Sequence, residues 1–354
     1  MKLLKSVLIC LFVSLLAMTG CSTEIDLNAP ARDIWVVYGV LSQPDTVQYV
    51  RIAKAFLPES DALVFAKEND LSAKGLKVTL TGGGRTYEAV QIDSVMKNPP
   101  DGVFNPYTTL YKFRTAGNLA LQEGITYQLR VTQPGTDTFA LEASTTIPKK
   151  VRFNNPIEVP GPGQKRCLRM VNLELDYAVE FTREGTGAYE MRVFLDYTAD
   201  GVARQAVYGP TALFTDDIRC NTGGSTACYN FKAYEVIRGF YNQIQPQPTV
   251  NYLYGVDENN RCKEVVENLP VVFRFEVTSM DTYLTNYRQA NNPAFADFNT
   301  VRPEYTNITA SAGSYAIGLL GSTNRNFARA RLSPCAEYLL DLNNTPKPEG
   351  ICAL

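Results

Sequence analysis

The sequence predicts a mainly β protein, in which an immunoglobulin-like β-sandwich is followed by a second β-rich, sandwich-like or barrel-like domain with a short helix. Three observations predict this fold class. Apolar residues alternate with polar ones, as at Leu76, Val78 and Leu80, which is the period of a strand with one buried face. Turns that contain glycine or proline separate such runs at short intervals. Tyrosine and phenylalanine are frequent, with 20 and 17 copies, and aromatic side chains favour sheets.

The first domain is expected over residues 34–148. It opens with the β-branched and aromatic run Ile34–Tyr38, and its turns include Gly82–Gly84 and Gln133–Thr136. About seven short strands in such a segment are typical of an immunoglobulin-like sandwich, although the core cysteines of antibody domains are missing. Because no P-loop lysine follows Gly82–Gly84, we expect a hairpin turn there and not a phosphate-binding loop.

The second domain is expected over residues 149–354. Two alternating runs, Leu173–Phe181 and Tyr189–Tyr197, flank a glycine-containing turn and predict a hairpin. Further along, Ser279 is expected to cap a short helix over residues 280–290.

The N-terminal residues 1–20 have the pattern of a secretory signal peptide. Lys2 and Lys5 lead into an apolar run that is too short for a stable transmembrane anchor. Cys21 follows directly after two small residues, as in a bacterial lipobox, so we expect its thiol to be acylated and to anchor the protein in a membrane. The alternative is an ordinary cleaved signal followed by an incidental cysteine. Residues 21–33 are polar and are expected to form a tether.

Charge and composition limit the function classes. The chain has 34 basic and 36 acidic residues, a formal net charge of −2, and no basic cluster, so nucleic acid is not an expected partner. It contains no histidine, which removes Ser-His-Asp and Cys-His nucleophile pairs and imidazole ligands for zinc. We therefore expect no catalytic residues, no metal site and no cofactor. A hydrolase that uses two carboxylates in a cleft remains an alternative, and the acidic loop Asp257–Asn260 is expected to be a solvated turn and not a calcium site.

Six cysteines remain once Cys10 and Cys21 are assigned to the signal peptide and the lipid. An even number in an exported protein predicts disulfides, and the sequence leaves their pairing open. Proximity favours Cys220–Cys228 and Cys335–Cys352, which leaves Cys167 and Cys262 as the third pair. A zinc site built from these thiols is the alternative, although no C-x-x-C spacing occurs.

The aromatic residues offer a candidate binding surface. Most of them are expected to fill the sheet cores. Tyr283 and Tyr287 on one face of the predicted helix, with Tyr305 and Tyr315 in the segment after it, are harder to assign to a core. Exposed tyrosines are frequent anchors of interfaces, so these four are the predicted surface.

Four segments of the chain resemble a known family. They are the lipobox with Ile25–Leu27, the run Trp35–Leu41, the run Tyr305–Thr309, and Ala316–Gly321. Together they are similar to the Bacteroidota lipoproteins called domain of unknown function 4249. The resemblance implies an outer-membrane lipoprotein, often encoded beside a TonB-dependent receptor, and it supplies no catalytic residues.

Two short segments, Asp45-Thr46-Val47 and Asp93-Ser94-Val95, resemble the O-glycosylation motif of these bacteria, with Thr46 and Ser94 as the acceptors. From all of this we predict a non-enzymatic lipoprotein, anchored in the outer membrane and exposed at the cell surface. It would be an accessory subunit of a TonB-dependent transporter that captures ligand or binds a partner. The alternative is a structural or adhesive protein of the cell envelope with no transport role.

Overall fold

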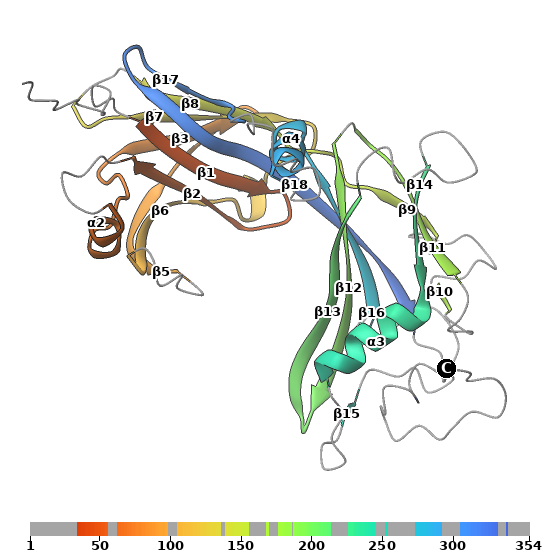
Figure 1. Cartoon of the computed structure of the whole chain (residues 1–354). Helices are drawn as coiled ribbons and strands as arrows, with labels where there is room; N and C mark the ends of the chain where they lie inside the picture. The colour runs from red at the N-terminus through yellow and green to blue at the C-terminus, as the bar shows by residue number, and fades with distance from the viewer. Residues whose placement is uncertain are drawn as a thin grey trace, which may run out of the picture. The chain divides into compact units, whose positions relative to one another are not determined.

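The computed structural model describes the chain from Ile34 to Arg331 with gaps, together with Tyr338. The protein is mainly β, as predicted, and has three α-helices among the described residues (Figure 1). Within that part of the chain, no helix combines the length and the apolar character needed to cross a bilayer. The described ranges are 34–55, 62–97, 105–135, 139–155, 168–169, 176–185, 187–213, 226–244, 252–253, 273–291 and 305–331.

The largest sheet has ten strands and joins segments that are far apart in the sequence. Its hydrogen-bonded order is β13-β12-β16-β18-β1-β2-β6-β5, with β10 also paired to β18 and β15 to β12 (Figure 1). In chain order these strands are β1 (Ile34–Ser42), β2 (Val47–Lys54), β5 (Val90–Met96), β6 (Tyr107–Arg114), β10 (Leu168–Arg169), β12 (Tyr189–Ala199), β13 (Val202–Leu213), β15 (Tyr252–Leu253), β16 (Phe273–Met280) and β18 (Tyr315–Arg331).

A five-stranded sheet packs against the β1, β2 and β6 part of the large sheet. Its order is β17-β8-β7-β3-β4. β3 pairs antiparallel with β4, and β7 with β8, so both hairpins predicted from the turn sequences Gly82–Gly84 and Gln133–Thr136 are confirmed. These five strands are β3 (Lys77–Gly82), β4 (Arg85–Glu88), β7 (Thr126–Thr132), β8 (Phe139–Thr146) and β17 (Ile308–Ala310). Side chains of both sheets form one core, which includes Trp35, Val37, Ile52, Phe113, Leu80, Leu129, Leu141, Ile308 and Leu320.

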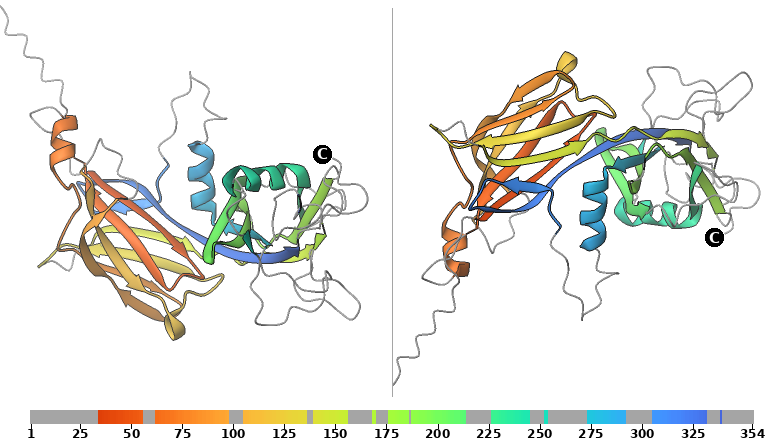
Figure 2. Two further views of the ribbon diagram at one scale, coloured as in Figure 1. Left: turned by 90° about the horizontal axis from the view of Figure 1, so that it is seen from below. Right: turned by 90° about the horizontal axis from the view of Figure 1, so that it is seen from above.

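A second core lies between the other end of the large sheet, a three-stranded sheet and a helix. The small sheet has the order β14-β11-β9, formed by β9 (Arg152–Asn155), β11 (Asp176–Thr182) and β14 (Thr226–Lys232). Helix α3 (Ala233–Ile244) lies against β13 and β14 (Figure 2). Its buried residues follow the helical period, which marks one apolar face. They are Ala233, Val236, Ile237, Phe240 and Ile244.

The hairpin predicted from Leu173–Phe181 and Tyr189–Tyr197 is wrong. β11 pairs with β14 and β9, whereas β12 pairs with β13 and β16. The described part of the first run lies in β11, and the second run lies in β12, which is buried on both faces over much of its length. Alternation in a sequence indicates which face a side chain takes and not which strand lies beside it.

The short helix forms close to where it was predicted, with a different cap. α4 spans Thr282–Ala290, and the Oδ1 of Asp281 accepts a hydrogen bond from the amide of Leu284 at 2.7 Å. Ser279, the predicted cap, lies instead in β16, where it pairs with Asn324. Serine and aspartate are both good N-caps. Because β16 pairs with β18 as far as Met280, the helix begins after that residue and Asp281 is its cap.

Two shorter helical segments complete the described part, namely α2 (Ala62–Glu68) and the 3-10 helix η1 (Gly117–Leu119).

Strand β18 belongs to both cores. Its first part pairs in parallel with β1, from Tyr315 opposite Ile34 to Thr323 opposite Ser42. From Thr323 onward it pairs antiparallel with β16. Ile308, Ala310, Ala316 and Leu320, which the sequence suggested as part of the second domain, therefore pack with the first core.

Candidate functional site

Three polar side chains interrupt the core-facing side of β18 between the two cores. This side carries Leu320 in the first core and Ala328 in the second, and between them lie Ser322, Asn324 and Asn326. We call these three residues the polar ladder.

The polar ladder binds the segment that connects the two cores. Ser322 Oγ donates to the carbonyl oxygen of Thr146 at 2.7 Å. The side-chain amide of Asn324 donates to Pro148 O at 3.0 Å, and that of Asn326 to Val151 O at 2.9 Å. Because buried carbonyl groups need donors where no neighbouring strand supplies them, the sequence of β18 changes here from apolar to polar.

Asp281 links α4 to the same region. Its side chain is only 7% exposed, and burial raises the pKa of the carboxyl group against the opposing effect of its hydrogen bonds with Thr145 and the amide of Leu284. The Thr145 hydroxyl donates to Oδ2 and also lies 2.8 Å from Ser322 Oγ. Both oxygens of Asp281 therefore serve the fold, since one caps a helix and the other is bonded to β8.

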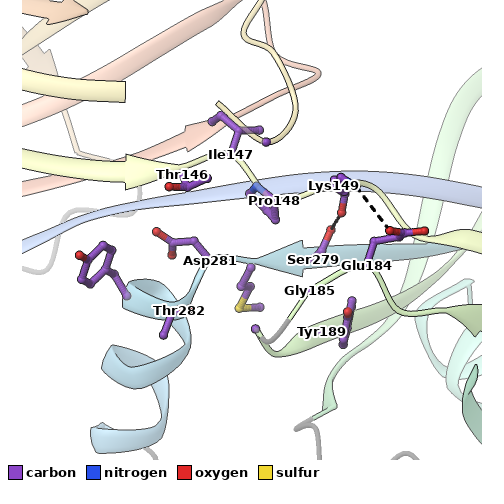
Figure 3. Close-up of a pocket in the computed structure, with 14 residues that line it drawn as sticks. Thr146, Ile147, Pro148, Lys149, Glu184, Gly185, Tyr189, Ser279, Asp281 and Thr282 are labelled. Atoms are coloured by element: carbon purple, nitrogen blue, oxygen red, sulfur yellow. Dashed lines mark hydrogen bonds and ion pairs between the residues drawn. The ribbon is translucent and has the colours of Figure 1, made fainter. Parts of the chain in front are cut away.

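A pocket of about 380 Å³ lies beside this junction (Figure 3). The connecting segment, the loop before β12, the end of β16 and the start of α4 form its walls. Lys149 Nζ and Glu184 Oε2 lie 3.8 Å apart at its edge, and the Ser279 hydroxyl donates to Lys149 O at 2.9 Å. Its charged side chains are thus paired with each other or bonded within the fold. In the described ranges, no three His, Cys, Asp or Glu side chains are grouped so that they could hold a metal ion.

The four predicted tyrosines do not form one surface. Tyr287 and Tyr305 pack on a small cluster of Met280, Leu284 and Leu319. Tyr283 lines the pocket, and Tyr315 is exposed at the start of β18 opposite Ile34. The structure therefore brings together only two of them.

A different aromatic surface lies next to Tyr287. α4 covers the outer side of β18, where a Cβ added to Gly321 would lie 2.9 Å from Leu284 Cβ. The outer side of the neighbouring strands is open, and Tyr38, Val40 and Tyr49 are 40%, 43% and 45% exposed there.

Two cations complete this surface. Arg51 lies opposite Tyr38 in the sheet, and Lys112 lies opposite Tyr49. We call Tyr38, Val40, Tyr49, Arg51 and Lys112 the open face.

One edge of the open face packs against α4. The rings of Tyr38 and Tyr287 meet edge to face, with centroids 6.5 Å apart and planes at 70°. Burial, and then the nearby Tyr287 hydroxyl, raise the pKa of Tyr38, so its hydroxyl keeps its proton and remains a hydrogen-bond donor. This surface was not predicted, because most aromatic side chains were expected to fill the sheet cores. The available signal was that the run Trp35–Leu41 is apolar or aromatic at every position, and not only at alternate ones.

The remaining predicted sites are only partly within the described residues. Thr46 and Ser94 are both exposed, the first in the turn after β1 and the second in β5. Cys228 lies half-buried in β14. Cys21, the loop 257–260 and the other five disulfide candidates, Cys167, Cys220, Cys262, Cys335 and Cys352, lie outside the described residues, so lipidation and the disulfide pairing stay predictions.

No protein-family model matches the chain, and no curated protein matches it. The family resemblance therefore stays a prediction from its four segments. The structure adds that three of these segments meet. Trp35–Val40 pairs with Ala316–Gly321 in register, and the side chain of Asn307 bonds both the amide of Leu320, at 2.9 Å, and its carbonyl oxygen, at 2.8 Å.

Proposed function

We propose that this protein is a lipid-anchored, non-enzymatic partner-binding protein of the bacterial outer membrane, displayed at the cell surface. In this proposal it belongs to the domain of unknown function 4249 lipoproteins and is an accessory subunit of a TonB-dependent transporter. The observation that carries the binding role is the open face, where exposed tyrosine rings and basic side chains lie together on a sheet.

The chemistry of the open face suits a protein partner. Tyrosine and arginine are enriched where interfaces contribute most of their binding energy, because a ring buries a large area and loses little conformational freedom. Tyr38 already packs against Tyr287, so binding would cost less entropy than ordering a side chain without such a contact. Arg51 and Lys112 would add electrostatic steering toward an acidic surface.

Two features support binding over catalysis. The chain has no histidine, and the buried carboxylate at the pocket, Asp281, uses both oxygens to hold Thr145 and the start of α4. A carboxylate in that position is poorly placed to exchange protons with a substrate.

The finer fold assignment is also part of the proposal. Residues 34–148 would form an immunoglobulin-like sandwich, and the second core a sandwich-like or barrel-like domain. The packing of two sheets around one core that includes Val37 and Leu129 supports the first assignment.

Co-purification from solubilised outer membranes tests the function. The wild type should retain a TonB-dependent receptor, and a Tyr38→Ser, Tyr49→Ser variant should retain it about tenfold less, since removal of interface anchors costs at least one decade in affinity. Tyr241→Ser is the matched control, because Tyr241 on α3 is 45% exposed, as Tyr49 is. Wild-type protein that is recovered without any receptor would contradict the proposal.

A deletion strain separates this proposal from the structural or adhesive alternative. Loss of growth on particular defined nutrients supports a transport role. Normal growth with altered envelope integrity or cell aggregation supports the alternative.

A further inference from the structure

A second group of exposed apolar side chains lies at the end of the large sheet where the chain enters β1. Leu63 and Val64 on α2 are 63% and 51% exposed, Met96 at the end of β5 is 61% exposed, and Tyr107 at the start of β6 is 44% exposed. We call these four residues the N-terminal rim.

Strand register places the N-terminal rim beside the start of β1. Ala55 N bonds Ile34 O at 2.8 Å, so the end of β2 lies next to the beginning of β1. β6 is antiparallel to β2, with Val50 opposite Tyr111, which brings the start of β6 to the same end. There Tyr107 pairs with Met96.

Helix α2 is attached to the same end. The amide of Asn105 bonds Ala66 O at 2.8 Å, and its side-chain amide bonds Glu68 O at 3.2 Å. Figure 1 shows α2 at the end of the sheet where β1 begins and β2 ends. The four apolar side chains thus come from three elements and gather at one end of the sheet.

The rim has the composition of a surface that meets a lipid interface. Single exposed apolar residues are ordinary on soluble proteins, but several together on one edge mark a contact surface. Tyrosine is favoured at the level of lipid headgroups, and lysine near it can extend its ammonium group toward anionic phosphates. Lys67 on α2 and Lys97 directly after Met96 stand in these positions.

The length of the tether indicates what the N-terminal rim contacts. Ile34 comes only 13 positions after the predicted lipid-bearing Cys21, and this separation spans at most about 45 Å when the chain is fully extended. The start of β1 therefore lies within about 45 Å of the predicted anchor, so the N-terminal rim beside it can reach the membrane surface. A tethered surface also needs little affinity of its own, because its second contact is intramolecular.

We propose that the N-terminal rim contacts the surface of the membrane that holds the lipid anchor, with Leu63 and Val64 at the headgroup boundary. This inference rests on the proposed lipid anchor and adds a second, direct contact that fixes the orientation of the sheet. The open face then stands at a defined angle to the membrane, available to a partner embedded in it.

Tryptophan fluorescence in vesicles tests the contact. The chain has a single tryptophan, Trp35, which is 2% exposed and gives a constant background. Full-length lipidated protein carrying Leu63→Trp is reconstituted in phosphatidylethanolamine–phosphatidylglycerol vesicles, with and without brominated acyl chains. Val202→Trp is the matched control, since Val202 is 57% exposed in β13 at the far end of the large sheet.

We expect brominated lipid to lower the added fluorescence of Leu63→Trp by about twofold, because an interfacial side chain reaches the acyl boundary. The fluorescence of Val202→Trp should not change. In a Leu63→Ser, Val64→Ser background, a Met96→Trp reporter should lose its quenching while the protein still floats with the vesicles.

Three other outcomes would refute the contact between the N-terminal rim and the membrane. Floating protein with equal, weak quenching of Leu63→Trp and Val202→Trp refutes the rim and leaves the lipid anchor intact. A blue shift of Leu63→Trp without bromine quenching means that protein, and not lipid, covers the rim. Protein that does not float refutes the anchor, and the rim proposal fails with it.

Discussion

The two parts of β18 hold the molecule together in different ways. The first part pairs with β1 by backbone hydrogen bonds, and glycine allows the two strands to approach closely. Further along, the polar ladder donates side-chain hydrogen bonds to a segment that is not paired with it as a strand. The comparison teaches that one strand can join two cores if its side chains become polar where its neighbour is no longer a paired strand. Four predictions test this difference, and they follow from the largest expected effect to the smallest.

The closest approach in the first part is at Gly318. Its φ is +114°, and an added Cβ would lie 1.9 Å from Val37 O, which is backbone and cannot move aside. We expect Gly318→Ala to lower the free energy of unfolding by about 3–5 kcal/mol, the range of severe strain and lost packing. Urea unfolding measures it.

Gly313→Ala is the control for backbone conformation alone. Gly313 also has a positive φ, +88°, but an added Cβ would meet nothing within 4 Å. It should cost about 1–2 kcal/mol. Equal costs for the two substitutions would contradict the close approach of β18 to β1.

In the polar ladder, the largest effect is expected at Asn324, which is 1% exposed. Its amide donates to Pro148 O and to Glu123 Oε1, both at 3.0 Å. Asn324→Ala leaves these acceptors without that donor and should cost about 2–3 kcal/mol. Asn291→Ala, which removes an exposed bond to Tyr287 O, is the control and should cost less than about 1 kcal/mol. Similar losses of stability in the two variants would mean that the ladder does not hold the connecting segment.

Asp281 gives the junction a pH dependence. Burial raises its pKa in the folded protein above the ordinary 3.8, so the folded state binds this proton more tightly than the unfolded state does. The contribution of Asp281 to stability is therefore greatest below the ordinary pKa, and it falls as pH rises through the raised pKa.

Asp281→Asn removes this titration. Across urea unfolding curves from acid to neutral pH, the stability of the wild type relative to Asp281→Asn should fall with rising pH. A constant difference between the two proteins would show that the carboxyl group is not perturbed, and an increasing one would reverse the sign.

The smallest loss of stability is expected at the edge strand β13. The side chain of Gln243 on α3 bonds Val207 N at 2.9 Å and Val207 O at 2.6 Å, so a side chain again satisfies backbone groups. Gln243→Ala should cost about 1 kcal/mol and expose part of a strand edge, which favours self-association. Light scattering against protein concentration measures it. Asn242→Ala on the same helix is the control. Equal self-association of both variants would contradict the role of Gln243 in covering the backbone groups of Val207 at the strand edge.

The sequence was sufficient for features determined by short segments. The mainly β class, the turns at Gly82–Gly84 and Gln133–Thr136, and a helix close to residues 280–290 all follow from local residue patterns. Strand partners did not follow, because β1 and β18 are separated by most of the chain and no local signal identifies their pairing.

Helix α3 was not predicted, although its buried residues recur at the helical period in the sequence, at Ala233, Val236, Ile237, Phe240 and Ile244. Its start has no boundary signal, because it follows β14 without a turn residue and Val236, Ile237 and Tyr241 also favour strands. Of the candidate surface, the sequence identified Tyr287 but not Tyr38 or Tyr49, because exposure in a sheet depends on what covers each face. Here α4 covers β18 and leaves the outer side of β1 and β2 open.

Photo-crosslinking in intact cells tests the central claim, that the protein is anchored at the outer membrane and binds its partner through the open face. A crosslinking amino acid is placed at Tyr49 and, as the control, at Tyr241 on α3. We predict that the protein with the crosslinker at Tyr49 is captured with a TonB-dependent receptor and that the protein with the crosslinker at Tyr241 is not. Capture of the same receptor at equal yield from both positions, or of none from Tyr49, would contradict the account.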